Sequence, residues 1–166
     1  MTAPKGDPSQ YRPAVGIAVF NSDGKIWLGK RYKSRGSKLW QMPQGGIDSG
    51  EATEVAAARE LWEETGITLK MVTPIGEIDD WLYYDFPEKY KGVKATKGWL
   101  GQKQKWYAFR FHGKKKHINL KTHGAQEFSK WRWNNLADTP DLIVPFKRDV
   151  YVRIADEFER FSRPIK

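Results

Sequence analysis

The sequence predicts an α/β protein in which a mixed β-sheet lies between helices, an α/β/α sandwich. Three observations lead to this fold class. Apolar, β-favouring runs open the chain, one helical segment follows at residues 52–65, and further β-favouring runs precede a second helical segment that begins at Pro145. The order strands, helix, strands, helix brings one sheet and two helices together around a core.

The first strands are predicted close to the N-terminus. Residues 14–20 form a buried strand, residues 21–24 a turn and residues 25–30 the returning strand. Residues 40–44 lead into the helix as a short strand or extended edge, because Pro43 cannot donate to a β-ladder. After the helix we expect two short strands, at residues 71–78 and 81–84, and an exposed excursion at residues 87–101, which is rich in lysine and glycine.

Residues 102–111 are the clearest later strand, since β-favouring aromatic residues dominate them. A turn with three lysines follows at residues 113–116, residues 117–120 resume extended structure, and residues 130–133 form another strand. Pro145 fits the first turn of a helix that runs to about residue 161. Its predicted buried stripe has i, i+4 spacing and consists of Val150, Ile154 and Phe158.

Length and composition restrict the classes of protein to consider. The 166 residues suit one domain, and we expect a flexible lead-in at residues 1–10 and a single domain at residues 11–166. The sequence has no cysteine, which excludes disulfides and thiolate metal sites. It has neither the roughly 20-residue apolar run of a membrane span nor a signal peptide's apolar run. We therefore expect a cytoplasmic protein with no membrane and no obligate protein partner.

The sequence is strongly basic, with 29 Lys and Arg against 20 Asp and Glu and a formal charge of +9. Such an excess favours polyanionic partners through electrostatic attraction and counterion release. Charge alone fits equally well a basic protein with no preference for polyanions. Eight Trp, seven Tyr and eight Phe provide rings on which bases can stack, although most such rings belong to the core.

The first predicted helix carries an acidic stripe. Glu60, Glu63 and Glu64 stand at i, i+3 and i+4, so their side chains share one face. Like charges at this spacing repel one another. Hard divalent cations such as Mg²⁺ or Mn²⁺ bind carboxylate oxygens and would offset the repulsion. The alternative is a solvated face on which Arg59 pairs with Glu63.

Residues on either side of the acidic stripe define the helix ends. We expect Ser49 to be the N-cap and Gly66 to end the helix. Gly45 and Gly46 allow a tight loop into the helix, where free amides and the helix dipole favour an anion. We expect the carboxylates to be open to a bulky ligand, because Ala56 and Ala57 beside them are small, and we expect Val55, Ala58 and Trp62 to cluster on the other side of the helix.

Residues 45–67, GGIDSGEATEVAAARELWEETGI, match the pattern G-x5-E-x7-R-E-U-x-E-E-x-G-U, in which U is aliphatic. This pattern is the Nudix box, and every fixed position is present: Gly45, Glu51, Arg59, Glu60, Leu61, Glu63, Glu64, Gly66 and Ile67. Because so many fixed positions make a specific signal, the chain resembles the Nudix hydrolases. The resemblance implies the Nudix fold and a loop-helix-loop that holds divalent metals, Mg²⁺ or Mn²⁺, against a diphosphate.

Other segments resemble the bacterial RNA pyrophosphohydrolases and the related dinucleoside polyphosphate hydrolases. They are YRP at residues 11–13, WQMPQGGI at 40–47, GQKQKW at 101–106, EFSKWRW at 127–133 and FKRDVY at 146–151.

The resemblance implies roles for individual residues. The implied metal ligands are Glu60, Glu63, Glu64 and Glu127, with Gly45. The implied catalytic residues are Glu63, Glu64, Glu127 and Arg59. The implied substrate contacts are Arg12, Arg31, Gln44, Lys103, Lys105, Val144, Phe146 and Lys147. The implied structural residues of the loop are Gly45, Gly46, Glu51 and Gly66.

The resemblance implies removal of pyrophosphate from the 5′-triphosphate end of RNA, which leaves a 5′-monophosphate and favours RNA decay. One alternative is cleavage of diadenosine tetraphosphate to ATP and AMP. In both reactions a divalent cation lowers the pKa of the attacking water, and Glu64 or Glu127 takes its proton. A remote alternative is a non-catalytic RNA-binding module on the same scaffold. Such a module is expected to lose a carboxylate of the box, and this sequence keeps them all.

Overall fold

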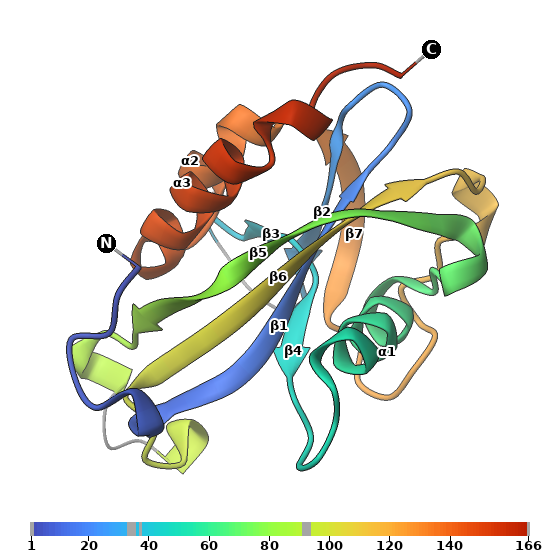
Figure 1. Ribbon diagram of the computed structural model, residues 1–166. Coiled ribbons are helices and arrows are strands. Elements are labelled where there is room, and N and C mark those ends of the chain that lie inside the picture. Colours follow the sequence, from blue (N-terminus) through green and yellow to red (C-terminus); the bar gives the residue numbers. More distant parts are fainter. Residues whose placement is uncertain (1, 33–35, 37, 91–93, 166) are drawn as a thin grey trace.

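The computed structural model describes residues 2–32, 36, 38–90 and 94–165, and it is a mixed sheet with helices on both faces (Figure 1). The strands of this part of the chain are β1 (Tyr11–Phe20), β2 (Ile26–Arg31), β3 (Trp40–Gln41), β4 (Gln44–Gly46), β5 (Val72–Asp85), β6 (Gly101–Phe111) and β7 (Phe128–Asn134). Their order is β3-β2-β1-β6-β5, with β4 paired to β1 and β7 paired to β2. β1 and β6 run parallel, whereas β5 and β6 run antiparallel.

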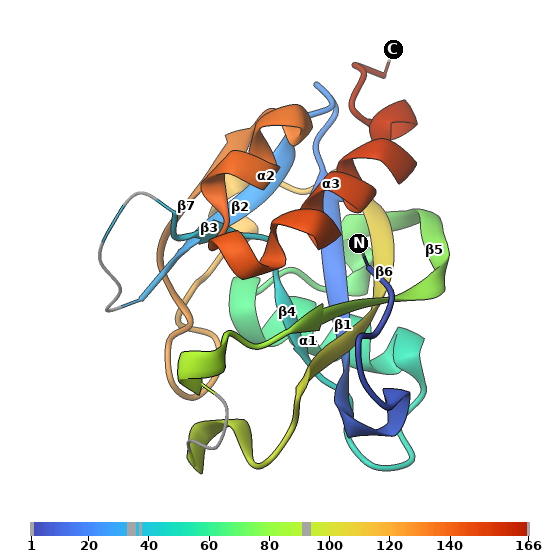
Figure 2. The same cartoon turned by 90° about the vertical axis from the view of Figure 1, so that its left-hand side faces the viewer.

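The helices form the two outer layers. α1 (Thr53–Thr65) covers one face of the sheet, and α2 (Thr139–Leu142) and α3 (Arg148–Glu157) cover the other (Figures 1 and 2). The predicted α/β/α sandwich is therefore confirmed. The stripe predicted for the last helix is also confirmed, because Val150, Ile154 and Phe158 are all buried under α3.

Each face of the sheet has its own hydrophobic core, because alternate side chains of a strand point to opposite faces. The core beneath α3 includes Phe20 and Trp106. The core beneath α1 includes Ile17, Trp27 and Leu61. The core beneath α1 fixes this helix against β1 and so positions its acidic residues.

Two predictions about strands were wrong. Residues 72–78 and 81–84 belong to one long strand, β5, whose pairing with β6 shifts register between Ile78 and Leu82, and Met71 ends the 3₁₀ turn before it. Such bulges interrupt the alternation that marks a strand in a sequence. Residues 117–120 form no strand; Lys115–His117 is a 3₁₀ turn, and the N–H of Asn119 donates to Thr65 O at the end of α1 (2.7 Å).

The helix ends differ partly from the prediction. Ser49 is not the N-cap, because α1 begins at Thr53, and Ala52 is its N-cap without a side-chain bond. Gly66 ends the helix in the left-handed region, with φ 77°, as predicted. The predicted last helix is divided into a 3₁₀ turn at Pro145–Lys147, α3, and a second 3₁₀ turn at Glu159–Phe161.

The expected lead-in contacts the sheet over its described residues. The N–H of Tyr83 donates to Thr2 O (2.8 Å), and the N–H groups of Lys5 and Gly6 donate to the Tyr11 hydroxyl. The expected excursion contains 3₁₀ turns at Glu88–Tyr90 and Lys94–Thr96, and residues 91–93 lie outside the described residues. None of the described helices has the length and apolar character needed to cross a membrane.

Packing of α1 onto the sheet gives a stability prediction. Leu61 is fully buried beneath α1, whereas Leu69, just beyond the helix, is 57% exposed. We expect Leu61→Ala to lower the free energy of unfolding by about 2–5 kcal/mol, because it leaves a cavity. The same change at Leu69 should cost less than about 0.5 kcal/mol. Urea unfolding of both variants measures the difference, and equal losses would contradict this account of the core.

Candidate active site

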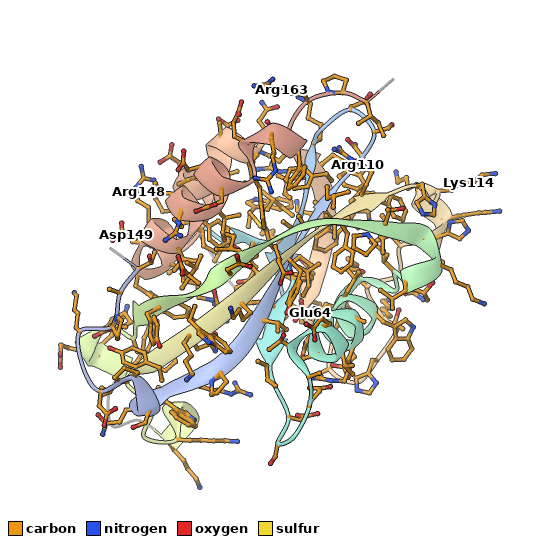
Figure 3. All side chains as sticks on the ribbon, viewed as in Figure 1. Glu64, Arg110, Lys114, Arg148, Asp149 and Arg163 are labelled. Carbon is orange, nitrogen blue, oxygen red and sulfur yellow. The ribbon has the colours of Figure 1, made fainter. Side chains whose placement is uncertain are left out.

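The acidic stripe of α1 faces the short strand β4. The N–H of Gln44 donates to Glu64 Oε2 (3.2 Å), and β4 is itself held by pairing with Ala14, Val15 and Gly16 of β1. Figure 3 shows Glu64 on the side of α1 that faces the sheet. The central strand β1 therefore fixes the backbone against which this carboxylate lies.

Gly45 and Gly46 lie in β4, so the prediction of a tight loop at these two residues was wrong. A Cβ on Gly45 would lie 2.0 Å from Glu60 Cδ, and a Cβ on Gly46 would lie 2.3 Å from Arg12 Nη2. Real Cβ atoms never approach so closely, so the glycines leave room for one carboxylate and one guanidinium. This close approach brings Glu60 and Arg12 to adjacent positions on β4.

Arg59 connects the loop, the helix and β4. Its Nε and Nη2 donate to the two carboxylate oxygens of Glu51 (2.8 and 2.9 Å), and Nη2 also donates to Gly46 O (2.9 Å). Its Nη1 donates to Glu60 Oε1 (2.8 Å) and to Glu63 Oε2 (3.3 Å). Glu51 also accepts from the N–H of Asp48 (3.0 Å), and the Arg59 contact lowers its pKa to about 2.

The expectation that the carboxylates are exposed was wrong for two of them. Glu60 and Glu64 are buried, with Glu64 only 8% exposed, and Glu63 is half-buried. Val55 and Trp62, placed away from the carboxylates, are instead 57% and 40% exposed. Glu60 and Glu64 therefore lie on the side of α1 that packs on the sheet, where the small residues Ala56 and Ala57 let the helix come close to β1.

Glu64 lies among other carboxylates. Burial raises its pKa well above the usual range, and the charges of Glu127 and Glu60 raise it further. Burial also raises the pKa of Glu60, against the opposing influence of Arg59 and Arg12. Glu127, from the segment before β7, is exposed and therefore reaches the same region from the solvent side. A cluster of negative charge in a buried position favours a bound cation.

Two basic residues lie beside this acidic cluster. Lys147 is buried, and its pKa is lowered to about 8 by burial and by the charge of Arg31, while Glu127 and Glu64 oppose that shift. Arg31 is exposed at the end of β2. The structure thus brings Arg31 and Lys147 into the electrostatic neighbourhood of Glu64 and Glu127, where they can attract an anion.

Phe146 and Val144 form an aromatic and apolar wall next to Lys147. The ring centroid of Phe146 lies 5.7 Å from that of Tyr84 and 6.1 Å from that of Tyr90. The Lys147 ammonium lies 5.9 Å from the centre of the Phe146 ring. Phe146 and Val144 are both half-buried. One part of each side chain packs against the core beneath α3, and the other part is exposed to solvent.

Lys103 and Lys105 do not contact the carboxylates in the described structure. Their ammonium groups lie 5.1 and 5.4 Å from the centre of the Trp81 ring, and Lys105 also donates to Asp79 O. Both lysines belong to β6, and their ammonium groups lie against the Trp81 ring of β5.

Two residues near the cluster were not predicted from the sequence. Gln104 Nε2 donates to Gln44 Oε1 (3.0 Å), and Gln104 Oε1 accepts from Trp106 Nε1 (3.0 Å), so a buried amide holds the Gln44 side chain. In the sequence, the only indication that Gln104 has such a role is the alternation of Gln102 and Gln104 in β6. His123 Nε2 lies 3.7 Å from Glu63 Oε1, and nothing local in the sequence indicates it.

The donor set suits a hard divalent cation. All the grouped acidic side chains offer oxygen atoms, the type of ligand that Mg²⁺ and Mn²⁺ prefer. Within the described residues no three carboxylate or histidine side chains already converge as a closed set of ligands. Arg59 explains this, since it occupies one oxygen of Glu60 and one of Glu63. The buried carboxyl group of Glu64, which lies close to other acidic side chains, is the observation that fits a cation.

Comparison with known proteins agrees with the fold and the box. A family model described as NUDIX domain matches residues 10–154. An RNA pyrophosphohydrolase of Caulobacter vibrioides is 48% identical over 158 residues, which cover 95% of this chain and 91% of that protein. One of Agrobacterium fabrum is 44% identical over 95% of this chain and 97% of that protein.

Solved structures show the same architecture. An Ap4A hydrolase of C. elegans in a binary complex has a TM-score of 0.60 at 18% identity, covering 89% of this chain and 98% of that chain. The E. coli dihydroneopterin triphosphate pyrophosphohydrolase has a TM-score of 0.64 at 17% identity with the same coverage. The architecture is that of an α/β/α sandwich with an acidic helix packed on its sheet. The chain belongs to the Nudix family.

The contact between Gly45 and Glu60 gives a second prediction. Gly45→Ala should displace the Glu60 carboxylate and reduce hydrolytic turnover by about a hundredfold, as small misplacements at reacting centres do. Gly50→Ala is the control, because its added methyl meets nothing within 4 Å although φ is 76°. Steady-state kinetics compares the two variants, and equal effects would contradict the account that the Gly45 contact with Glu60 is what matters for turnover.

Proposed function

We propose that this protein is a metal-dependent hydrolase that removes pyrophosphate from the 5′-triphosphate end of RNA, with Mg²⁺ or Mn²⁺ as its cofactor. The observation that carries the proposal is buried Glu64, which faces Glu60 and Glu127 with Lys147 and Arg31 beside them. The RNA substrate is supported by relatives named RNA pyrophosphohydrolase that are 44–48% identical over 95% of this chain. Such a substrate places the enzyme in the cytoplasm.

The carboxylates and the basic residues have separate tasks in this proposal. Glu60, Glu63 and Glu64 hold the divalent cation, with Glu127 facing them and the Gly45 backbone beside Glu60. When bound, the cation offsets phosphate charge and lowers the pKa of water. Arg12, Arg31 and Lys147 bind phosphate oxygens, since guanidinium and ammonium groups complement them.

The remaining residues orient the substrate. The first base stacks on the exposed part of Phe146, with Val144 beside it, because the Phe146 and Tyr84 rings form a wall next to Lys147. Gln44 holds Glu64 through its backbone N–H, and its side chain is fixed by Gln104. The proton of the attacking water passes to Glu64 or to Glu127, whose charge acts on Glu64.

A substrate comparison tests the proposed function. We expect the unaltered protein to release pyrophosphate from a triphosphorylated RNA at least about tenfold more efficiently, in kcat/KM, than it cleaves diadenosine tetraphosphate at the same Mg²⁺ concentration. EDTA should abolish both reactions, and added Mn²⁺ or Mg²⁺ should restore them. A preference for the dinucleotide would overturn the RNA assignment, and full activity in EDTA would overturn the metal assignment.

A matched pair of variants tests the role of the acidic stripe. Glu64→Gln keeps the shape of the side chain but removes the charge, so we expect kcat to fall by about 10²–10⁴-fold. Glu54→Gln, on an exposed position in the first turn of the same helix, should leave kcat unchanged. Pyrophosphate release measures both, and circular dichroism checks that each variant is folded. Unchanged turnover in Glu64→Gln would contradict the catalytic role of this carboxylate, and no pyrophosphate release by the unaltered protein would favour the non-catalytic binding module.

A further inference from the structure

A cavity of about 850 Å³ lies between the β1–β2 turn, the end of β6 and β7. Three aromatic rings line it: Phe111, Trp131 and Trp133. The ring centroid of Trp133 lies 5.9 Å from that of Phe111 and 5.7 Å from that of Trp131. Trp131 and Trp133 are half-buried, so part of each ring faces the cavity. We refer to this space as the β7 cavity.

The polar residues of the β7 cavity are basic or neutral. Arg110, Lys115, Lys130 and Arg132 line it, and the described residues that line it include no Asp or Glu. Arg110 is already engaged, since its Nη1 donates to Asn21 O (2.8 Å) and to Phe161 O (3.2 Å). Arg132 lies 4.0 Å from the centre of the Trp40 ring. Lys115 and Lys130 are exposed, and the Lys130 ammonium lies 5.9 Å from the centre of the same Trp40 ring.

The neighbouring loop adds to this positive charge. Lys114 and Lys116 flank Lys115 and are exposed. Figure 3 shows the Lys114 side chain extending outward from the molecule, at the opposite end of the sheet from the chain's N-terminal turn. A lysine-rich loop over half-buried rings combines the two components of single-strand nucleic-acid sites, cations for the backbone and aromatic faces for the bases.

The strand β7 connects this cavity with the candidate active site. Glu127 precedes β7 directly, and Trp133 lies near its end. At about 3.3 Å per residue, the path from Glu127 to Trp133 covers about 20 Å. Figure 1 shows β7 running from beside α1 toward the β1–β2 turn. Ser129, Lys130 and Arg132 are exposed along it, so an RNA chain can follow the strand.

We propose that the β7 cavity is a second RNA-binding site, which takes a base and the adjoining phosphates of single-stranded RNA downstream of the 5′ end. The proposal rests on the proposed function in taking RNA as the substrate. It also goes beyond the proposed function, because a second site would let the enzyme distinguish an RNA chain from a short nucleotide, which the site around Glu64 alone cannot do. An acidic protein partner would fit the cations but would not require the group of aromatic rings that lines the cavity.

Charge reversal at the β7 cavity tests the proposal. The test variant is Lys115→Glu/Lys130→Glu, and the control variant is Lys94→Glu/Lys97→Glu. Both variants change the net charge equally. The control lysines are exposed and lie near the start of β6, whereas the cavity lies at the end of that strand. The substrates are a triphosphorylated dinucleotide and a triphosphorylated RNA of about 12 nucleotides. We expect the cavity variant to raise KM for the longer RNA about tenfold, with kcat and the dinucleotide kinetics unchanged. The control variant should match the unaltered protein.

A second variant and a binding measurement separate the possible outcomes. Trp133→Leu keeps an apolar side chain against Phe111 but removes the ring, and it should raise KM for the longer RNA alone; a melting curve checks its folding. Anisotropy of a labelled 5′-hydroxyl RNA, which has no triphosphate to cleave, should show about tenfold weaker binding to both cavity variants. This measurement tests the cavity even if the protein releases no pyrophosphate, the result that would defeat the proposed function. Unchanged RNA binding, or equal losses in the lysine control, would overturn the β7 cavity as an RNA site.

Discussion

The candidate site depends on one guanidinium, that of Arg59. Its planar fork binds both oxygens of Glu51 in the loop, and its remaining N–H groups reach Gly46 O in β4 and the carboxylates of Glu60 and Glu63. A lysine could not replace it, because an ammonium group lacks the fixed bidentate geometry. The loop, the helix and β4 are thus connected by a single side chain, which also orients the carboxylates of Glu60 and Glu63.

This arrangement leaves Glu64 as the least compensated charge. Arg59 satisfies one oxygen of Glu60 and one of Glu63, whereas the hydrogen bond described for Glu64 comes from the backbone N–H of Gln44. Burying a carboxylate costs free energy unless it is paired, and the nearby charges of Glu127 and Glu60 increase that cost. A fold that keeps such a group sacrifices stability at this position, which is typical of functional sites.

The sequence predicted the parts of the fold that rest on local patterns. The buried stripe of α3 and the Gly66 end of α1 follow from periodicity and from the left-handed conformation of glycine, and both were confirmed. The spacing of the box also showed which residues share a helical face. These features depend on residues close together in the chain, so a single sequence contains them.

The rest depends on contacts between distant segments. Helical spacing placed Glu64 on one face with Glu60 and Glu63, but whether that face meets solvent or the sheet depends on Ala56 and Ala57 packing against β1. The same holds for Gly45, whose missing Cβ matters because the Glu60 side chain lies over it and not because a loop turns there.

Strand β7 extends this reasoning across the molecule. Its first residues lie by the acidic helix and its last ones beside the ring of Phe111, so one strand joins two regions that local sequence patterns treat separately.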